Sequence, residues 1–474
     1  MSRILSKIFP IIDYLYIYQT LEYKLWEFLA WFLKNPFKRN LQKKHQLEWT
    51  QKTQLLAFLS IALLALDSII TSYLLTGTFW LILILFPIKS LYSPLFLIVA
   101  EILISPLEYY RKQKTLESAK QKLSKLPNLK IVAITGSFGK TSTKDILYTL
   151  LWKKYFVVKT PKSFNTPLGI AQTILGDIKD NTQIFIAEAG AYKKGEIAEI
   201  AKLLNPSIGI ITAVAPQHLG KFGSLENIAK AKFELVENLA KNGVAILNNE
   251  SELLQKLASH SSSGNVKFYG KDSQYFASDI KVTPDGTSFI LHTPHATTNI
   301  SIPLIGEHHA QNFLAATVAA LQLGLTLSEI KERAKLLLPT PHRMEIKKQG
   351  NIILIDNSFN TNPKSARASL SLLVSFKENR KIIITPGFVE LGKEAAKENQ
   401  KFGHEIFCLA DEVIIVGDNA RKDLLEGMRD INKNPEESVH FAKSTQEALI
   451  LAQGLTQGVE TVVLLENDLP DQYS

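Results

Sequence analysis

The sequence predicts an α/β protein with three parts: an N-terminal transmembrane helical hairpin, a central, mainly parallel α/β domain, and a C-terminal Rossmann-like α/β domain. The most hydrophobic stretches lie before residue 105, where two apolar runs predict the hairpin. From Leu129 onward, apolar strands alternate with helical segments, which is typical of a parallel sheet with crossover helices. The segment Leu338-Pro339-Thr340-Pro341 interrupts this alternation and indicates a domain boundary.

Length, cysteine content and charge limit the kinds of protein that this chain can be. The 474 residues leave room for about three domains, and the one cysteine, Cys408, cannot form an internal disulfide. The net charge of +9 comes largely from basic clusters on the two outer flanks of the hydrophobic region, so it favours a membrane surface over a nucleic-acid partner. These clusters are Lys34, Lys38, Arg39, Lys43 and Lys44 before the region, and Arg111, Lys112, Lys114, Lys120 and Lys122 after it.

Residues 1–50 mix aromatic, aliphatic and charged side chains. Within them, residues 1–33 have the composition of an amphipathic helix at a bilayer interface. The alternative is a helix that packs on the soluble part of the protein. No small-residue cleavage site follows, so we do not expect a removed signal peptide.

Residues 51–125 are predicted to form the two-helix hairpin and a charged linker. The runs Leu55–Leu75 and Phe79–Ile104 are long enough to cross a bilayer, and only the uncharged Thr76-Gly77-Thr78 joins them. The basic outer flanks place both ends in the cytoplasm by the positive-inside rule, giving a two-span cell-membrane protein with cytoplasmic domains. Asp67 and Lys89 lie within the runs, either in a functional role or as a structural pair.

Residues 126–338 form the predicted central domain, which begins with a phosphate-binding motif. The strand Ile131–Thr135 leads into Gly136-Ser137-Phe138-Gly139-Lys140-Thr141-Ser142, and a helix follows. Glycines let backbone N–H groups approach phosphate oxygens, Lys140 adds positive charge, and Thr141 offers a hydroxyl to Mg²⁺. This P-loop is two residues shorter than the general pattern, and the alternative is an ordinary helix-capping turn.

Further strands are predicted on both sides of the boundary. In the central domain, Glu188 ends an apolar strand, and a carboxylate at such a strand tip beside a P-loop is well placed to hold Mg²⁺. Residues 339–474 are expected to form the smaller C-terminal domain. The predicted strands are Gln183–Glu188, Ile208–Ala213 and Val244–Asn248, with less regular β-character from Val266 to Ile302, then Ile352–Ile355, Lys381–Thr385, Glu412–Val416, Val439–Phe441 and Thr461–Leu465.

Several separated motifs between residues 128 and 450 resemble the Mur ligase family in order and spacing. This family consists of ATP-dependent enzymes that join an amino group to a carboxylate. The matching segments are Glu188-Ala189-Gly190, Thr212 to Ser224, Ala229-Lys230-Ala231-Lys232, Gly306 to Asn312, Pro341-His342-Arg343-Met344-Glu345 and Asp356 to Pro363.

The resemblance implies a set of metal and acceptor residues. Glu188 would hold one Mg²⁺, and His218 would bind a second Mg²⁺ together with Lys232, which CO₂ would carbamylate. Without the family, His218 would be a loop histidine and Lys232 a solvated lysine. Asn165 and Thr166 would lie near the carboxylate of the acceptor substrate.

The resemblance also implies an ATP site that both domains build. Asn312 would meet the adenine, Arg343 the phosphates, and Asp356 or Asn357 the ribose, while Asn360 and Asn362 are assigned to substrate. Three positions depart from the family pattern: His309 replaces a usual Asn, His342 a common Gly, and Asn357 the second Asp of an Asp-Asp-Ser motif. The final strand departs too, because Leu464 to Pro470 stands where the dipeptide-adding branch usually has Lys-Gly-Ser.

The function that the resemblance implies is a membrane-anchored, ATP-dependent ligase of cell-wall precursor synthesis that works through an acyl phosphate. The motif beginning at Asp356 favours the branch that adds D-alanyl-D-alanine or a similar amino substrate to a muramyl peptide. No soluble α/β pattern precedes Leu129, so the hairpin takes the place of the usual UDP-sugar-binding domain, and the acceptor is either lipid-linked or a soluble UDP-linked peptide. We make no prediction of the oligomeric state.

Two alternative functions follow from the same sequence. One is a ligase of another envelope polymer or of a poly-amino-acid. The other is a P-loop ATPase of transport or signalling, which the absence of a Walker B strand and the presence of His218, Lys232 and Arg343 disfavour.

Overall fold

The computed structural model describes residues 11–468 except 22, 36–46, 162–163, 192, 217–221, 262–264, 284, 340–341, 343, 359–362, 390, 392–393, 432–433 and 457. The described chain divides into two compact units, the first ending at Lys114 and the second running from Thr115 to Asp468. The division falls within a single long helix, α6, which spans Ser93–Ser124.

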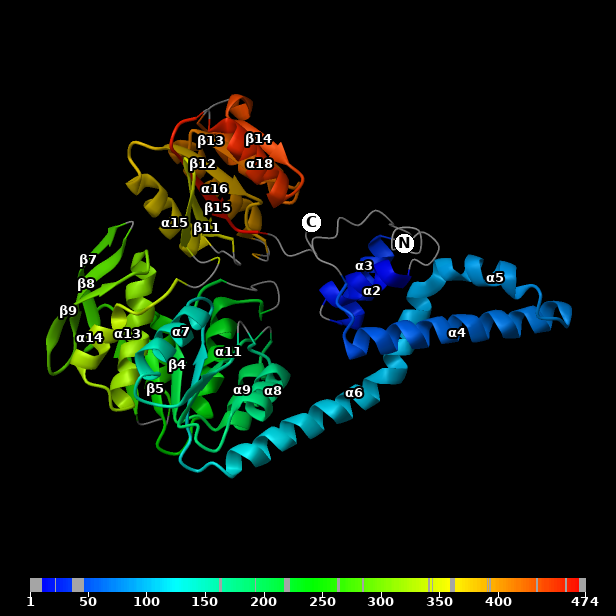
Figure 1. Cartoon of the computed structure of the whole chain (residues 1–474), viewed down its shortest axis with the longest axis horizontal. Coiled ribbons are helices and arrows are strands. Elements are labelled where there is room, and N and C mark those ends of the chain that lie inside the picture. The colour runs from blue at the N-terminus through cyan, green and yellow to red at the C-terminus, as the bar shows by residue number, and fades with distance from the viewer. Residues whose placement is uncertain are drawn as a thin grey trace. The chain divides into compact units, whose positions relative to one another are not determined.

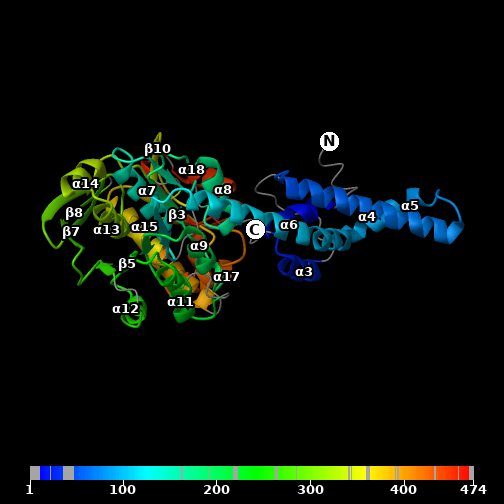
Figure 2. The ribbon, with the colours of Figure 1, turned by 90° about the horizontal axis from the view of Figure 1, so that it is seen from below.

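The first unit is entirely helical in its described part (Figure 1). Its longest complete helix, α4, begins after the capping hydroxyl of Thr50 and ends at Gly77, whose φ of 66° allows the left-handed turn that stops the helix. The following helix, α5, lies beside α4 (Figures 1 and 2). The helices are α2 (Ile11–Thr20), α3 (Leu25–Lys34), α4 (Gln51–Thr76), α5 (Ile82–Lys89), a 3-10 turn (Ser90–Tyr92) and α6.

Ion pairs and an aromatic core hold these helices together. Lys89 Nζ lies 2.5 Å from Asp67 Oδ2, so the two charges predicted within the apolar runs pair with each other. At the other end of α4, Lys52 pairs with Glu101 and Glu108 of α6. The buried side chains of α2, among them Tyr14, Leu15 and Tyr18, pack in the same core as Leu56, Leu97 and Ala100.

The helical part differs from the predictions both before the hairpin and within it. Helix α2 is packed into the first unit, whereas α3 keeps Trp26 80% exposed. The second apolar run is broken at Ser90–Tyr92, near Pro87 and Pro94, because proline lacks the N–H that continues a helix and is favoured in a first turn. Among the residues that the structure describes, the two helices with the length and apolar character to cross a membrane are therefore Gln51–Thr76 and Ser93–Ser124.

The central domain of the second unit is built on a six-stranded parallel sheet with the order β2-β3-β1-β4-β5-β6. In β1, Val132 and Ile134 face the helices α7 and α13, while Ile131 and Ala133 face α8 and α9, because successive side chains of a strand point to opposite faces. The strands are β1 (Lys130–Thr135), β2 (Val157–Lys159), β3 (Ile184–Glu188), β4 (Ile208–Ile211), β5 (Val244–Asn248) and β6 (Val266–Tyr269), and the helices are α7 (Lys140–Leu151), α8 (Pro167–Asp177), α9 (Glu196–Leu204), α11 (Leu225–Glu237) and α12 (Glu252–Ser259).

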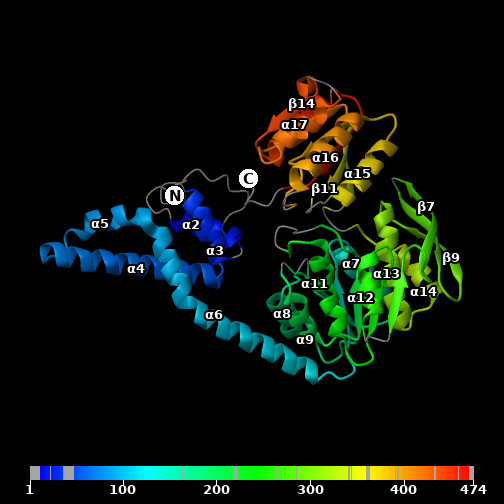
Figure 3. The ribbon, with the colours of Figure 1, turned by 180° about the vertical axis from the view of Figure 1, so that it is seen from behind.

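A three-stranded antiparallel sheet and one deeply buried helix complete this domain. The sheet β7-β8-β9 lies at its margin (Figures 1 and 3), in the segment where only irregular β-character was predicted. Helix α13 packs against α7, and its alanines Ala315, Ala316 and Ala319 have no exposed surface. The elements are β7 (Phe276–Thr283), β8 (Gly286–His292), β9 (Thr297–Ile302), α13 (Glu307–Gln322) and α14 (Leu327–Ala334).

The C-terminal domain contains a second six-stranded sheet, with the order β10-β11-β15-β12-β13-β14. Its strands are parallel except β10, which pairs with β11 as an antiparallel edge. All five strands predicted for this domain are confirmed, whereas β10, like β2, was not predicted. The elements are β10 (Glu345–Gln349), β11 (Ile352–Asn357), α15 (Pro363–Ser375), β12 (Arg380–Thr385), α16 (Ala395–Leu409), β13 (Glu412–Val416), α17 (Arg421–Arg429), β14 (Val439–Ala442), α18 (Thr445–Leu455) and β15 (Thr461–Glu466).

Candidate active site

The predicted phosphate loop joins β1 to α7 and packs tightly on its neighbours. A side chain on Gly136 would meet Thr212 Oγ1 at 1.9 Å, and one on Gly139 would meet Asn312 Oδ1 at 2.4 Å. Gly139 also has a φ of 81°, which favours glycine. These two positions therefore require glycine, and they bring Thr212 and Asn312 against the loop.

Hydrogen bonds fix the remaining loop residues. The Ser137 N–H donates to the Ala213 carbonyl at 2.8 Å, and the Thr212 hydroxyl donates to the Phe138 carbonyl. Lys140 Nζ donates to the Gly136 carbonyl at 2.6 Å, so its ammonium group lies over the loop. Ser142, also predicted at the site, is buried in the first turn of α7.

Glu188 is buried at the end of β3, next to the strand that enters the phosphate loop. It pairs in register with Ile134 of β1. Glu188 Oε2 accepts a hydrogen bond from the Thr141 hydroxyl at 2.9 Å and lies 3.3 Å from Lys144 Nζ. Its other oxygen accepts from Asn165 Nδ2 at 3.3 Å. The structure thus joins three predicted residues, Thr141, Glu188 and Asn165, into one polar group.

Lys144 belongs to this group and was not predicted. Its side chain is 1% exposed, and burial lowers the pKa of its ammonium below the ordinary value, while the carboxylate of Glu188 acts in the opposite direction. The signal was present in the sequence, because Lys144 follows Lys140 by four residues and therefore lies one helical turn further along α7.

Lys232 lies on α11 and is 6% exposed. Burial, and to a smaller extent the charge of Lys140, lower the pKa of its amine well below the ordinary value. Among the residues that the structure describes, none forms a hydrogen bond or an ion pair with its Nζ. The description of Lys232 as a solvated lysine, which the sequence without the family favoured, is therefore wrong.

Thr166 has a local structural role beside the site. It is the N-cap of α8, where its hydroxyl accepts a hydrogen bond from the Gly169 N–H at 3.3 Å. A comparable role belongs to Glu234 on α11, whose carboxylate accepts from the N–H groups of Gly195 and Ala198 at the start of α9. Both contacts fix the start of a helix, α8 or α9, near the carboxyl end of β3 where Glu188 lies.

A cavity of about 500 Å³ extends from the phosphate loop to the C-terminal domain. Its volume is within the range of small-molecule sites. Asn312 lines it beside Phe138 and Gly139, and His308 lines it from the start of the same helix. The C-terminal domain contributes Asn357 and six residues of α15 that include Arg367, so residues of both domains line this cavity.

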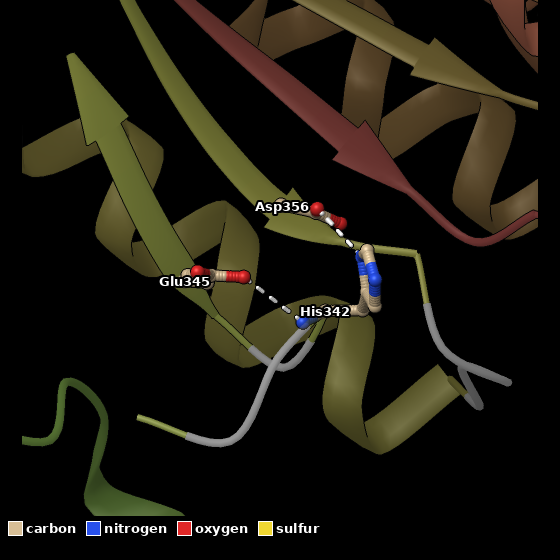
Figure 4. A group of neighbouring side chains, drawn as sticks. All are labelled: His342, Glu345 and Asp356. Atoms are coloured by element: carbon tan, nitrogen blue, oxygen red, sulfur yellow. Dashed lines mark hydrogen bonds and ion pairs between the residues drawn. The ribbon is translucent and has the colours of Figure 1, made fainter. Parts of the chain in front are cut away.

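Asp356 and His342 form a second polar group in the C-terminal domain (Figure 4). His342 Nδ1 lies 2.8 Å from Asp356 Oδ2, and the His342 N–H donates to Glu345 at 3.2 Å. Burial raises the pKa of Asp356, but hydrogen bonds from Ser358 and His342 outweigh it, so the pKa lies below its usual value. The three side chains have the donor types of a cation site, yet the Lys347 ammonium lies 3.0 Å from Glu345 and 3.5 Å from Asp356.

The backbone at His342, a departure from the family pattern, has a conformation that suits glycine. Its φ of 61° lies in the left-handed region, which glycine adopts without cost and histidine tolerates better than most residues. The contact with Asp356 gives the larger side chain a place in this conformation.

Asn357 is buried in the last position of β11. Its Nδ2 donates to both carboxylate oxygens of Glu466, each at 3.1 Å. Both positions depart from the family pattern, and their pairing is not evident from the sequence. The parallel register of β11 and β15 places them opposite each other.

Four predicted site residues lie outside the described residues: His218, Arg343, Asn360 and Asn362. Their expected roles at the second metal, the ATP phosphates and the substrate remain predictions. The predicted site residues that the structure describes are the phosphate loop, Glu188, Lys232, Asn165, Thr166, Asn312, Asp356 and Asn357.

A phosphate loop, a buried carboxylate at the adjacent strand end, and a second α/β domain on the same cavity define the class of two-domain P-loop proteins. Two family models match the chain: the Mur ligase middle domain over residues 134–320, and the Mur ligase, glutamate ligase domain over residues 342–465. The chain belongs to the Mur ligase family.

Similar proteins include UDP-N-acetylmuramoyl-tripeptide--D-alanyl-D-alanine ligases. The one from Buchnera aphidicola is 34% identical over 61% of this chain and 64% of its own length, and the one from Bacillus subtilis is 32% identical over 56% and 57%. The matched region thus spans less than two thirds of these relatives. Among solved structures, MurF from Acinetobacter baumannii superposes with a TM-score of 0.69 and 26% identity, covering 76% of this chain and 78% of that one.

The contact between Lys144 and Glu188 makes a prediction about stability. Replacing Lys144 by Met leaves the buried Glu188 carboxylate without its cation, so we expect the free energy of unfolding to fall by about 3–5 kcal/mol. Mg²⁺ should offset part of this loss, because a divalent ion supplies the missing positive charge. Chemical unfolding of the full-length protein with and without Mg²⁺ measures both effects.

Lys153→Met is the matched control, since this lysine is exposed just beyond the same helix. It should change stability by no more than about 0.5 kcal/mol. An unfolding midpoint for Lys144→Met equal to that of the wild type would contradict the assigned ion pair.

Proposed function

We propose that this protein is an ATP-dependent ligase of cell-wall precursor synthesis that forms an amide bond through an acyl phosphate. Its amino substrate would be D-alanyl-D-alanine or a similar amine, and its acceptor the carboxylate of a muramyl peptide. The observation that carries this proposal is the buried contact of Glu188 with Thr141 and Lys144 at the phosphate loop. A loop that only capped a helix would have no need for this carboxylate.

The residues around Glu188 fit a bound Mg²⁺. The Thr141 hydroxyl and one Glu188 oxygen are 2.9 Å apart, and both are hard oxygen ligands of the kind that Mg²⁺ takes. When bound, the ion would neutralise charge on the phosphates during transfer. Lys140 would turn from the Gly136 carbonyl to the phosphates, and Arg343 is proposed to approach them from the C-terminal domain.

The environment of Lys232 supports the proposed carbamate. Its amine is buried and has a pKa well below the ordinary value, so a larger share is neutral at physiological pH. A neutral amine attacks CO₂, forms an N–C bond and releases one proton, which gives a carbamate anion. Counted from the lysine ammonium, two protons leave in all, and an anion takes the place of a cation. The carbamate and His218 would then hold the second Mg²⁺, which the lysine itself would repel.

The chain's own residues suggest an order for the reaction. The acceptor carboxylate, near Asn165, attacks the γ-phosphorus of ATP, and ADP leaves. The amine then attacks the acyl carbon, and the tetrahedral intermediate collapses to an amide and phosphate. A cavity lined by residues of both domains favours keeping water from the acyl phosphate, which water would otherwise hydrolyse.

We further propose that the first unit anchors the enzyme in a membrane. Helix α4, with 26 residues, is about 39 Å long, which exceeds the apolar thickness of a bilayer. Large exposed aromatic residues lie at both ends, with Trp49 and Tyr109 near the Lys52 ion pairs and Trp80 near Gly77. This distribution is typical of membrane interfaces.

Such an anchor would keep the catalytic domains beside a lipid-linked acceptor. The other possibility is that the anchor is only a tether and the acceptor is a soluble UDP-linked muramyl peptide. A ligase of another envelope polymer remains the alternative function, because Glu466 stands in the segment where the dipeptide-adding branch has Lys-Gly-Ser.

The ligase proposal predicts that ADP formation needs both substrates. The full-length protein in detergent should release ADP from ATP and Mg²⁺ only when a muramyl tripeptide and D-alanyl-D-alanine are both present. Mass spectrometry should detect the amide product in equal amount. ADP release that is indifferent to both substrates would contradict the ligase and favour an ATPase.

The carbamate makes a separate prediction. With ¹³C-bicarbonate, the wild-type protein should give a carbamate carbon signal by NMR that fades as the pH is lowered, because protonation removes the nucleophilic amine. Lys232→Ala should lack the signal and the ligase activity, and a short-chain carboxylic acid should restore part of the activity. Lys230→Met, at an exposed position on the same helix, should keep both. Full activity in Lys232→Ala would argue against the carbamate.

The anchor predicts a definite membrane topology. Cys408 is exposed in the C-terminal domain, so a membrane-impermeant maleimide should label it only after cells are opened. In a Cys408→Ser background, Thr78→Cys, in the turn after α4, should be labelled in intact cells. Labelling of the residue-78 cysteine only in opened cells would contradict a hairpin that crosses the membrane.

A further inference from the structure

Glu466 is a buried acid in the C-terminal domain that has no part in the chemistry described above. It is the last residue of β15 and has no exposed surface. Its carboxylate accepts hydrogen bonds from Asn357 Nδ2, at 3.1 Å to each oxygen, and from the Ser369 hydroxyl. Glu466 does not itself line the cavity, whereas Asn357 does.

The residues at positions 357 and 466, which are neighbours across two strands, complement each other. The family pattern has an acid at position 357 and Lys-Gly-Ser in the segment that contains Glu466. In this chain the acid is on β15, and the hydrogen-bond donor is on β11. An acid at both positions would place two carboxylates side by side in a buried sheet, which is strongly unfavourable. The departure at 357 is therefore chemically matched to the one at 466.

The contact with Glu466 determines which way the Asn357 amide points. An asparagine side chain has one donor group, Nδ2, and one acceptor, Oδ1. Both oxygens of Glu466 accept from Asn357 Nδ2, so Nδ2 and not Oδ1 faces Glu466. The amide is thereby turned so that its oxygen is directed away from Glu466, and Asn357 presents the acceptor of the aspartate that it replaces.

We propose that Glu466 is a positioning residue for nucleotide selection: it holds the amide of Asn357 so that Oδ1 accepts a hydrogen bond from a ribose hydroxyl of the bound nucleoside triphosphate. This inference rests on the proposed function, because it requires ATP in the cavity. Phosphates on the loop at Gly139 leave the nucleoside half of ATP in the cavity that Asn357 lines. The ribose hydroxyls there are donors that match an acceptor.

The test compares ribose hydroxyls directly. Dissociation constants of ATP, 2′-deoxy-ATP and 3′-deoxy-ATP, each with Mg²⁺, are measured by calorimetry on the full-length protein in detergent. The wild type should bind at least one deoxynucleotide about 3- to 10-fold more weakly than ATP, the effect of one neutral hydrogen bond. Glu466→Gln should reduce the ratio of the deoxynucleotide and ATP dissociation constants to below about twofold. A glutamine at position 466 both donates and accepts, so it no longer holds the Asn357 amide in one orientation.

Two further variants separate positioning from a general loss of structure. Ser369→Ala removes the other described hydrogen bond to Glu466 and leaves Asn357 untouched, so it should keep the wild-type ratio. The double variant Asn357→Asp with Glu466→Lys restores an acid paired with a base and should also recover the wild-type ratio. If Glu466→Gln does not fold, the double variant decides, and a folded double variant that binds all three nucleotides equally would overturn the proposal.

Other outcomes are equally informative. A wild type that binds ATP and both deoxynucleotides equally well would overturn this inference and leave the proposed function standing. An unchanged ratio in folded Glu466→Gln would also overturn it, as would an equal loss in Ser369→Ala. Absence of any ATP binding would overturn the proposed function together with this inference.

Discussion

The buried carboxylate of Glu188 is the group on which the rest of the site depends. A charge without exposed surface is stable only with close partners, and the surrounding fold provides them from separate elements. Thr141 and Lys144 come from the helix after the phosphate loop, and Asn165 comes from the segment before α8. The carboxyl ends of β1 and β3 meet at this point because the strands are parallel neighbours.

Buried polar groups of the C-terminal domain also have matched partners, but the chemistry of the partners differs. At Glu188 a cation offsets a buried acid, whereas the described donors to Glu466, from Asn357 and Ser369, are neutral. At His342 a side chain occupies a backbone conformation suited to glycine, and Asp356 holds it. The departures from the family pattern in this domain thus have local compensations.

The sequence predicted the sheet strands well, because buried parallel strands are continuous apolar runs such as Val244–Asn248. It missed β2 and β10, which are short or polar edge strands without such a run. It also treated residues 79–104 as one span, although prolines break the helix there. The motifs identified Glu188 and Asn312, but Lys144 and the pairing of Asn357 with Glu466 depend on contacts across elements that spacing alone does not reveal.

Helix α13 is part of the hydrophobic core, and it also carries Asn312. Its alanines pack without exposed surface, so a larger side chain at Ala315 or Ala319 would displace the helix within the core. That movement would also shift Asn312 relative to Gly139. The packing that folds the domain therefore also limits the shape of one wall of the cavity. A change of the cavity wall is therefore easier at Arg367, whose side chain is half-exposed on the C-terminal side, than on α13.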